Sequence, residues 1–455
     1  MNGNIFEEVG DACVKCAKCV PGCTIYRIHK DETTSPRGFL DLMRLNAQNK
    51  LKLDTNLKHL LETCFLCTAC VETCPFHLPI DTLIEKAREK IAQKYGIAWY
   101  KKSYFSLLKN RKKMDRVFSV AHFLAPCVFK QVGDSLEPRM AFKGLFKRFK
   151  KSALPPLNQK SFLQKHAEMK PLENPIQKVA VFIGCLSNYH YQQVGESLLY
   201  ILKKLNIQAI IPKQECCSAP AYFTGDKDTT LFLVKKNIEW FESYLDEVDA
   251  IIVPEATCAS MLINDYYKVF LGEKDKDLYV KRLEKITPKI YLASVFLEKH
   301  TPLKHLLEKI PKGKKETITY HNPCHAKKTL NAHKEVRNLL NAHYEIKEMP
   351  DNCCGFGGIT MQTEKAGFSL KVGLLRAKEI MDTKAEIISA ECGACHMQLN
   401  NALKSLDDPN TPQFSHPLEL IAKALKSADS SKKNCKPYLT TPLKGAGLKK
   451  FLSVF

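Results

Sequence analysis

The chain has 455 residues, of which 19 are cysteines, and its formal net charge is +21. This length is enough for about three domains with buried cores, and no stretch reaches the roughly 18 apolar residues that a membrane-spanning helix needs. Dense cysteine indicates disulfides in a small secreted chain, but metal or redox work in an intracellular one. The first residues lack the basic and apolar regions of a secretory signal. We therefore expect a cytoplasmic protein whose thiols are available as metal ligands.

Two cysteine runs dominate residues 1–95, which we expect to form a helical domain with helices near 57–62 and 80–95. Both runs have the spacing C-x2-C-x2-C-x3-C, and Pro75 follows the second run. This is the spacing with which two-cluster ferredoxins hold [4Fe–4S] clusters, and there the fourth cysteine of a run ligates the other cluster. The eight predicted metal ligands are Cys13, Cys16, Cys19, Cys23, Cys64, Cys67, Cys70 and Cys74.

We predict two [4Fe–4S] clusters with crossed ligands. Cys74 completes the cluster of the first run, and Cys23 completes the cluster of the second run. Zinc is the alternative, because structural zinc also uses C-x2-C pairs. Zinc pairs usually lie well apart, however, whereas each of these runs places four cysteines within eleven residues. Thr24 stands where a proline is expected after the first run, which departs mildly from the bacterial pattern.

Residues 96–170 form a basic connector that we expect to be helical. Residues 100–165 contain sixteen Lys or Arg and three acidic residues. A solvated face between domains explains this charge, and so does contact with an acidic partner or with anionic lipids, where each basic residue contributes about 1 kcal/mol. Phe142, Phe146 and Phe149 lie among the basic residues and favour an amphipathic surface helix. No base-reading motif accompanies the charge, so we expect no nucleic-acid partner.

The rest of the chain contains an internal repeat, which we divide into units 171–300 and 301–425, followed by a polar tail, 426–455. In each unit, β-prone runs precede single cysteines, and a cysteine pair lies between them. Equivalent cysteines are offset by 139, 137 and 134 residues, which predicts two copies of one α/β unit. Strand runs that alternate with helices predict a mainly parallel sheet with its ligands beyond the carboxyl ends of the strands. The predicted fold class is thus α+β multidomain, with a helical ferredoxin domain and two repeated α/β domains.

The second copy has a complete cysteine set and the first does not. Neighbouring thiolates can bridge metal ions within one cluster, and Gly355 after the second pair allows close approach of the backbone. In the first copy Ser218 replaces this glycine, and Met261 stands where the last cysteine is expected. A thioether is a poorer iron ligand than a thiolate, so the first copy binds a less stable cluster or none. The predicted cofactor-binding residues are Cys185, Cys216, Cys217 and Cys258 in the first copy, and Cys324, Cys353, Cys354, Cys392 and Cys395 in the second.

Two histidines lie next to a predicted cluster ligand, and two further cysteines lie outside the predicted ligand sets. His321 and His325 flank Cys324, where they can hydrogen-bond to cluster sulfur or to a substrate, and a structural role is the alternative. Cys127 lies in an apolar stretch, which predicts a buried thiol. Cys435 lies in the tail, and the sequence indicates no role for it.

The repeated cysteine units resemble the CCG (cysteine-rich domain) family. That family includes heterodisulfide reductase subunits, the lactate utilisation iron–sulfur protein, the small subunit of anaerobic glycerol-3-phosphate dehydrogenase and the iron–sulfur subunit of glycolate oxidase. A helical ferredoxin domain followed by two CCG units is most similar to the last two, and the stretch Ser35-Pro36-Arg37-Gly38 is similar to iron–sulfur subunits of membrane-linked dehydrogenases. By this resemblance, the five cysteines of the second unit hold an additional, non-cubane [4Fe–4S] cluster.

The chain shows no phosphate-binding or dinucleotide fingerprint. Clusters carry one electron each, whereas oxidation of a hydroxy acid removes two electrons with a hydride and needs a cofactor such as flavin. The resemblance therefore implies an electron-transfer subunit, without catalytic residues of its own, in a flavin-dependent 2-hydroxy-acid (glycolate-like) dehydrogenase. Its partners are then a flavoprotein subunit and a membrane surface or quinone-linked protein on the way to the respiratory chain. The alternatives are the small subunit of an anaerobic glycerol-3-phosphate or lactate dehydrogenase, a catalytic heterodisulfide-reductase-like protein, and a stand-alone electron carrier.

Overall fold

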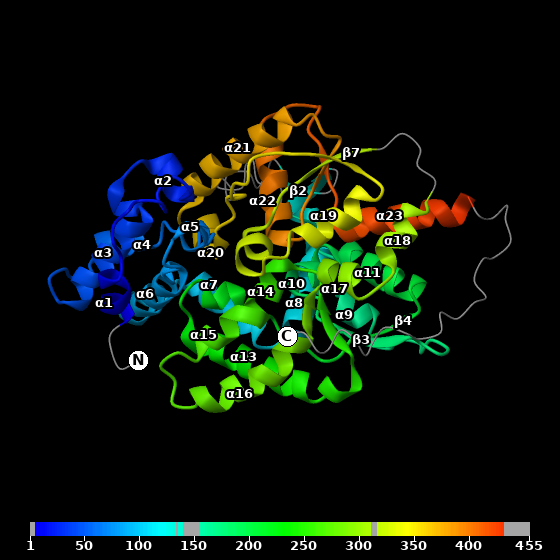
Figure 1. The fold of residues 1–455 in the computed structure, drawn as a ribbon, viewed down its shortest axis with the longest axis horizontal. Helices are drawn as coiled ribbons and strands as arrows, with labels where there is room; N and C mark the ends of the chain where they lie inside the picture. Colours follow the sequence, from blue (N-terminus) through cyan, green and yellow to red (C-terminus); the bar gives the residue numbers. More distant parts are fainter. Residues whose placement is uncertain (1–4, 133–134, 140–154, 311–315, 432–455) are drawn as a thin grey trace.

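A computed structural model describes four stretches of the chain, which are residues 5–132, 135–139, 155–310 and 316–431. Phe142, Phe146 and Phe149 lie outside these stretches, as does Cys435. Figure 1 shows the N-terminal helices in blue at one end of the molecule, beside one unit in green and another in yellow to orange. The predicted fold class, a helical ferredoxin region followed by two repeated α/β units, is confirmed.

The N-terminal region is helical, and polar side chains define where its helices begin. Ser35 accepts a hydrogen bond from the backbone nitrogen of Gly38 at 3.0 Å and caps one helix. A Cβ atom on Gly38 would lie 2.0 Å from the carbonyl oxygen of Glu32, so this turn requires glycine. Asp54 caps the next helix by accepting from the backbone nitrogen of Leu57 at 2.8 Å. The helices are α1 (Ile5–Asp11), α2 (Thr24–His29), α3 (Pro36–Ala47), α4 (Thr55–Leu61), α5 (Ala69–Thr73) and α6 (Ile80–Tyr95).

The connector is only partly helical, in contrast to the prediction. Its elements are the helices α7 (Trp99–Leu108), α8 (Arg111–Val128) and α9 (Phe162–Lys165), and an antiparallel pair of strands, β1 (Phe129–Val132) and β2 (Ser135–Pro138). Cys127 is exposed, so the prediction of a buried thiol is wrong. The apolar residues around it form an exposed face of α8 and not a core. Within the described stretches, no helix combines the length and the apolar character needed to cross a bilayer.

The first α/β unit is built on a parallel sheet with the strand order β4-β3-β5-β6. Val179 and Val181 lie in one hydrophobic core, and Ala180 and Phe182 lie in another. Because both faces of the sheet are covered, its strands are continuous apolar runs. The elements are β3 (Gln177–Val181), α10 (Cys185–Tyr189), α11 (Gln192–Lys204), β4 (Ile207–Ile210), α12 (Ala219–Tyr222), α13 (Lys227–Glu242), β5 (Ala250–Val253), α14 (Ala256–Ser260), α15 (Tyr266–Val269), α16 (Lys276–Ile286), β6 (Ile290–Leu292), α17 (Ala293–Lys299) and α18 (Leu303–Glu308).

The second α/β unit repeats this topology with the strand order β8-β7-β9-β10. In both units the first strand lies between the second and the third, and all pairs are parallel. Ile318 of β7, for example, pairs with Ile346 and Ile387 of its two neighbours. The elements are β7 (Thr317–Tyr320), α19 (Lys334–Asn341), β8 (Glu345–Lys347), α20 (Gly358–Thr363), α21 (Ala366–Asp382), β9 (Ile387–Ser389), α22 (Gly393–Lys404), β10 (Gln413–Phe414) and α23 (Pro417–Ser431).

The two α/β units share a hydrophobic core. Helix α23 of the second unit packs against α11 of the first, with Leu418 and Ile421 in the same buried cluster as Leu198 (Figure 1). The Tyr200 hydroxyl donates a hydrogen bond to Asp429 at 2.7 Å across this contact. Helix α23 therefore continues past the predicted end of the second unit at residue 425, because its apolar face covers both units.

Candidate iron–sulfur sites

The first group of thiols combines the first three cysteines of the first run with Cys74 of the second. Burial raises the pKa of the Cys19 thiol, and the neighbouring thiolates of Cys13, Cys74 and Cys16 raise it further. The structure thus brings Cys74 to Cys19, across more than fifty residues of sequence. This is the first of the two predicted crossed sets.

The second group combines Cys23 with the first three cysteines of the second run. Cys23, Cys64, Cys67 and Cys70 line one pocket near the start of α2 and the start of α5. Burial raises the pKa of Cys23 to about 12 and that of Cys64 to about 11. Thiols with such pKa values are protonated at neutral pH, so a metal that binds here displaces protons. Thr24, which replaces the expected proline, lies with its hydroxyl 3.2 Å from the Cys67 sulfur.

The two cysteine loops have the same unusual backbone, and this geometry fits a cluster. In both runs, the residues on either side of the second cysteine have positive φ angles. These residues are Lys15 and Ala17 in the first run, and Leu66 and Thr68 in the second. Such left-handed residues cost of order 1 kcal/mol each and persist at functional sites. They turn backbone N–H groups toward the sulfurs, as where the nitrogen of Leu66 donates to the sulfur of Cys64 at 3.4 Å. Concave arrays of N–H groups of this kind bind anions such as iron–sulfur clusters.

The second α/β unit brings its five cysteines together beyond the carboxyl ends of its strands. Cys353 interacts with the thiols of Cys324 and Cys354, and Cys395 interacts with those of Cys354 and Cys392; these neighbours and burial raise the pKa of both Cys353 and Cys395. The neighbouring thiols of Cys353 and Cys395, and then the ring of His321, hold the pKa of Cys354 well below its ordinary value. The backbone nitrogens of Gly355 and Cys395 each donate to a thiol sulfur at 3.4 Å. Five buried or half-buried thiols in one contact chain fit a multinuclear metal centre.

The second ferredoxin group and the second α/β unit meet at their cysteines. Cys67 of the ferredoxin region lies close to Cys353, and the interaction between the two thiols lowers the pKa of Cys67 and helps to raise that of Cys353. The ammonium group of Lys328 lies beside this contact. Burial alone lowers its pKa, but the surrounding thiolates of Cys324 and Cys67 raise it above the ordinary value. The two ligand sets therefore meet at a pair of cysteine sulfurs, one from each set, with a lysine ammonium group next to them.

The first α/β unit also brings its four cysteines together. Cys216 is in contact with Cys185 and Cys217, and Cys217 is in contact with Cys258. Ser218 has a φ angle of 74°, close to the 90° of the equivalent Gly355, so the backbone after the pair is retained without glycine. The set therefore has the geometry of the second unit with one thiolate fewer.

A half-buried arginine from the connector lies against this first set. Nη1 of Arg111, at the start of α8, lies 3.7 Å from the sulfur of Cys185. The Nε and Nη2 atoms of Arg111 are buried and have no hydrogen-bond partner within the described chain. An unpaired buried cation is costly, so this geometry fits a site that carries negative charge. No sequence pattern indicates Arg111, because it lies 74 residues from Cys185.

The two predicted histidines have different surroundings. A ring nitrogen of His321 and the sulfurs of Cys354 and Cys395 all lie within 4.8 Å of one another. His325, in contrast, stacks on Phe223 with ring centroids 5.6 Å apart, and its Nδ1 lies 3.2 Å from the hydroxyl of Thr257. Only His321 of this pair therefore reaches the cysteines.

Thr257 and Glu255 join the two α/β units at their cysteine sites. The hydroxyl of Thr257 lies 3.5 Å from the sulfur of Cys392. The carboxylate of Glu255 accepts a hydrogen bond from the backbone nitrogen of Gly393 at 2.6 Å. Glu255 and Thr257 precede Cys258 in the first unit, so the loops that carry Cys258 and Cys392 are directly linked.

These sites define an iron–sulfur protein in which a dicluster ferredoxin domain is joined to two cysteine-rich α/β domains. The 4Fe-4S dicluster domain family matches residues 10–78, and the CCG cysteine-rich domain family matches residues 179–263 and 318–400. The chain belongs to the family of CCG cysteine-rich-domain proteins, and it joins its two CCG domains to a dicluster ferredoxin domain. The matches support iron–sulfur clusters and a redox role.

Three relatives illustrate the range of this similarity. The probable glycolate oxidase iron–sulfur subunit of Bacillus subtilis (strain 168) is 26% identical over 445 residues, covering 92% of this chain and 96% of that protein. Lactate utilization protein A 2 of Bacillus cereus (strain AH820) is 30% identical over 255 residues, covering 54% of this chain and 99% of that protein. An uncharacterized iron–sulfur protein of Methanocaldococcus jannaschii is 26% identical over 405 residues, covering 88% of this chain and 69% of that protein.

Proposed function

We propose that this chain is the electron-transfer subunit of a flavin-dependent 2-hydroxy-acid dehydrogenase complex with a glycolate-like substrate. The observation that carries this proposal is the contact between Cys67 and Cys353. This contact supports the proposal because the cysteines proposed for one ferredoxin cluster then lie directly beside those proposed for the second α/β unit. A path for electrons then runs from the ferredoxin domain into the second unit and, by way of Thr257 and Glu255, on to the first.

The proposed ligand sets follow the contacts between thiols. Each ferredoxin group of four holds one [4Fe–4S] cluster, and the five cysteines of the second α/β unit hold a non-cubane [4Fe–4S] cluster. The four cysteines of the first unit hold a further metal centre, whose negative charge Arg111 offsets. When bound, the clusters supply one-electron chemistry. The chain supplies thiolate ligands, backbone N–H donors and burial from water.

A flavoprotein partner is proposed because substrate oxidation moves two electrons and a hydride, which one-electron clusters do not accept together. We expect a tagged chain, purified without oxygen from its own cells, to bring a flavoprotein with it. Glycolate should then bleach the visible absorption of the clusters, and lactate or glycerol-3-phosphate should do so more slowly. The measurement is anaerobic absorption spectroscopy of the purified complex with each substrate in turn.

Three results would redirect this proposal. Faster bleaching by lactate or by glycerol-3-phosphate would identify the corresponding dehydrogenase instead. Disulfide reduction by the isolated chain, lost on Cys353→Ser, would make the second unit itself catalytic. Purification without any flavoprotein, from cells that oxidise these substrates, would favour a stand-alone carrier.

We also propose that the connector attaches the complex to an anionic membrane surface. Val117, Val120, Phe123 and Leu124 of α8 are between 41% and 81% exposed and lie on one face of the helix. Exposed basic residues, Lys112, Lys113 and Arg116, lie at the N-terminal end of the same helix. An apolar stripe flanked by positive charge is typical of helices that lie in the headgroup region.

The double variant Val120→Glu/Phe123→Glu should bind anionic vesicles at least tenfold more weakly than the natural chain. Burial of each such apolar side chain contributes about 1.5–3 kcal/mol, and both contributions are lost. Co-sedimentation with phosphatidylglycerol vesicles measures this, and Leu278→Glu, which changes an exposed leucine of α16, is the matched control. Equal binding of both variants would refute attachment through α8.

A further inference from the structure

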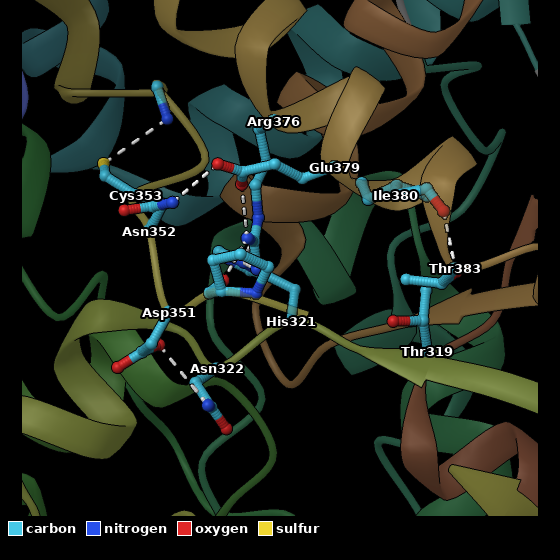
Figure 2. Close-up of polar contacts among 12 residues, drawn as sticks. Thr319, His321, Asn322, Asp351, Asn352, Cys353, Arg376, Glu379, Ile380 and Thr383 are labelled. Carbon is cyan, nitrogen blue, oxygen red and sulfur yellow. Dashed lines mark hydrogen bonds and ion pairs between the residues drawn. The ribbon is translucent and has the colours of Figure 1, made fainter. Parts of the chain in front are cut away.

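One ring nitrogen of His321 is fixed by a buried arginine. Nε and Nη2 of Arg376 lie 3.2 and 3.0 Å from Nδ1 of His321 (Figure 2). Arg376 is 1% exposed, and its Nη1 donates to the carbonyl oxygen of Pro350 and to the carboxylate of Glu379 at 2.7 Å. The guanidinium is thus held in one orientation on α21, with two of its N–H groups directed at the histidine.

This contact determines where His321 carries its proton. A guanidinium has hydrogen-bond donors and no acceptor, so Nδ1 of His321 must accept. A neutral imidazole that accepts at Nδ1 carries its hydrogen on Nε2. Nε2 is buried and has no hydrogen-bond partner within the described chain.

The sulfurs of Cys354 and Cys395 lie close to the ring of His321. A ring nitrogen of His321 lies within 4.8 Å of both the Cys354 and the Cys395 sulfur, and Nδ1 is taken by Arg376. A histidine that ligates a metal needs a free lone pair, and here the lone pair of Nδ1 faces Arg376 while Nε2 bears hydrogen. The arrangement therefore makes His321 a donor to sulfur and not a metal ligand.

We propose that His321 is a positioning residue whose Nε2–H donates to the Cys354 sulfur and raises the reduction potential of the centre held by the second unit. This inference rests on the proposed cluster in that unit. Reduction adds negative charge to the centre and its sulfurs, and an N–H donor stabilises the more negative state. The Arg376 charge is offset by Glu379, which also accepts from Asn352 at 2.6 Å (Figure 2), so the oriented N–H group is what acts on the sulfur.

The test is a redox titration of the full chain, loaded with clusters and followed by electron paramagnetic resonance. In His321→Phe the donor is lost, and the ratio of reduced to oxidised centre at a fixed potential should fall about tenfold. For a one-electron couple this is a shift of about −59 mV. In His321→Gln an amide N–H replaces Nε2–H, and we expect most of the potential to be retained. His325→Phe is the matched control, since His325 is half-buried next to Cys324 but contacts Thr257 and Phe223.

A second readout separates donation from ligation. Protein labelled with ¹⁵N-histidine should show a weak magnetic coupling between the reduced centre and one histidine nitrogen, and His321→Phe should abolish it. Arg376→Lys, which keeps one donor to Nδ1, should preserve this coupling. A coupling as strong as that of a directly bound nitrogen would overturn the inference.

The outcomes distinguish this inference from the proposed function. If the natural chain holds iron in the ferredoxin domain only, the proposed cluster of the second unit and this inference both fail. Only the inference fails if iron is present in that unit in every variant and one of two results is found. Either His321→Phe and His321→Gln shift the reduction potential equally, or they shift it no more than His325→Phe does.

Discussion

Cys23→Ala and Cys64→Ala should each remove about four irons per chain, since each cubane cluster holds four. The double variant should also remove only about four irons. The reason is that Cys23 and Cys64 line the same pocket and serve the same proposed cluster. Combining Cys23→Ala with Cys13→Ala should instead remove about eight irons, because these two cysteines belong to different groups although they lie in one sequence run. Iron analysis of protein purified without oxygen measures both results.

Cys127→Ala is the control for this series, because Cys127 is an exposed cysteine outside all four groups. It should leave the iron content unchanged. Uncrossed ligation would reverse the pattern, so that the Cys13/Cys23 pair costs one cluster and the Cys23/Cys64 pair costs two. A folding defect would lower the iron content of every single variant to the same low value, and circular dichroism of each variant identifies that case.

Arg111→Met should destabilise the metal-loaded protein by about 3–5 kcal/mol, which is typical when one partner of a buried charge pair is removed. The guanidinium lies against Cys185, and two of its nitrogens have no other partner within the described chain. We expect its removal to leave the thiolates of the first α/β unit without a counter-charge, and metal bound there should be lost first. Anaerobic denaturation followed by metal analysis measures both effects.

The size of the Arg111 effect is informative. If the four thiols of the first unit are protonated and hold nothing, Arg111 faces no thiolate charge and retains only the Glu215 carboxylate, and Arg111→Met should then cost clearly less than about 3 kcal/mol. Arg116→Met is the matched control, because Arg116 is exposed one turn further along α8 and should leave stability within about 0.5 kcal/mol.

The sequence was sufficient for those parts of the site that depend on local spacing. The crossed grouping of Cys23 and Cys74 agrees with the contacts, because the C-x2-C-x2-C-x3-C loop turns its fourth cysteine away from the first three. The equivalent strand orders of the two units follow from apolar runs repeated at a constant offset. The grouping of the cysteines and the strand order are each determined within short stretches of chain.

What the sequence did not predict depends on contacts between distant segments. The contact of Cys67 with Cys353 and the approach of Arg376 to His321 arise when preformed elements dock, and neither has a spacing signal. The prediction that the Cys127 thiol is buried is wrong for a related reason. Its apolar neighbours Val117, Val120 and Leu124 recur at helical spacing, which indicates one face of a helix but not whether that face meets a core or the exterior.

The central claim is that the thiolates of residues 13–74 hold two iron–sulfur cubes. Iron and sulfide analysis of the full chain, purified without oxygen and examined by electron paramagnetic resonance after reduction, tests it directly. We predict brown protein with at least about eight irons and as many sulfides per chain, and the signals of two interacting [4Fe–4S] clusters. Colourless protein that contains zinc, or no metal, would contradict the account.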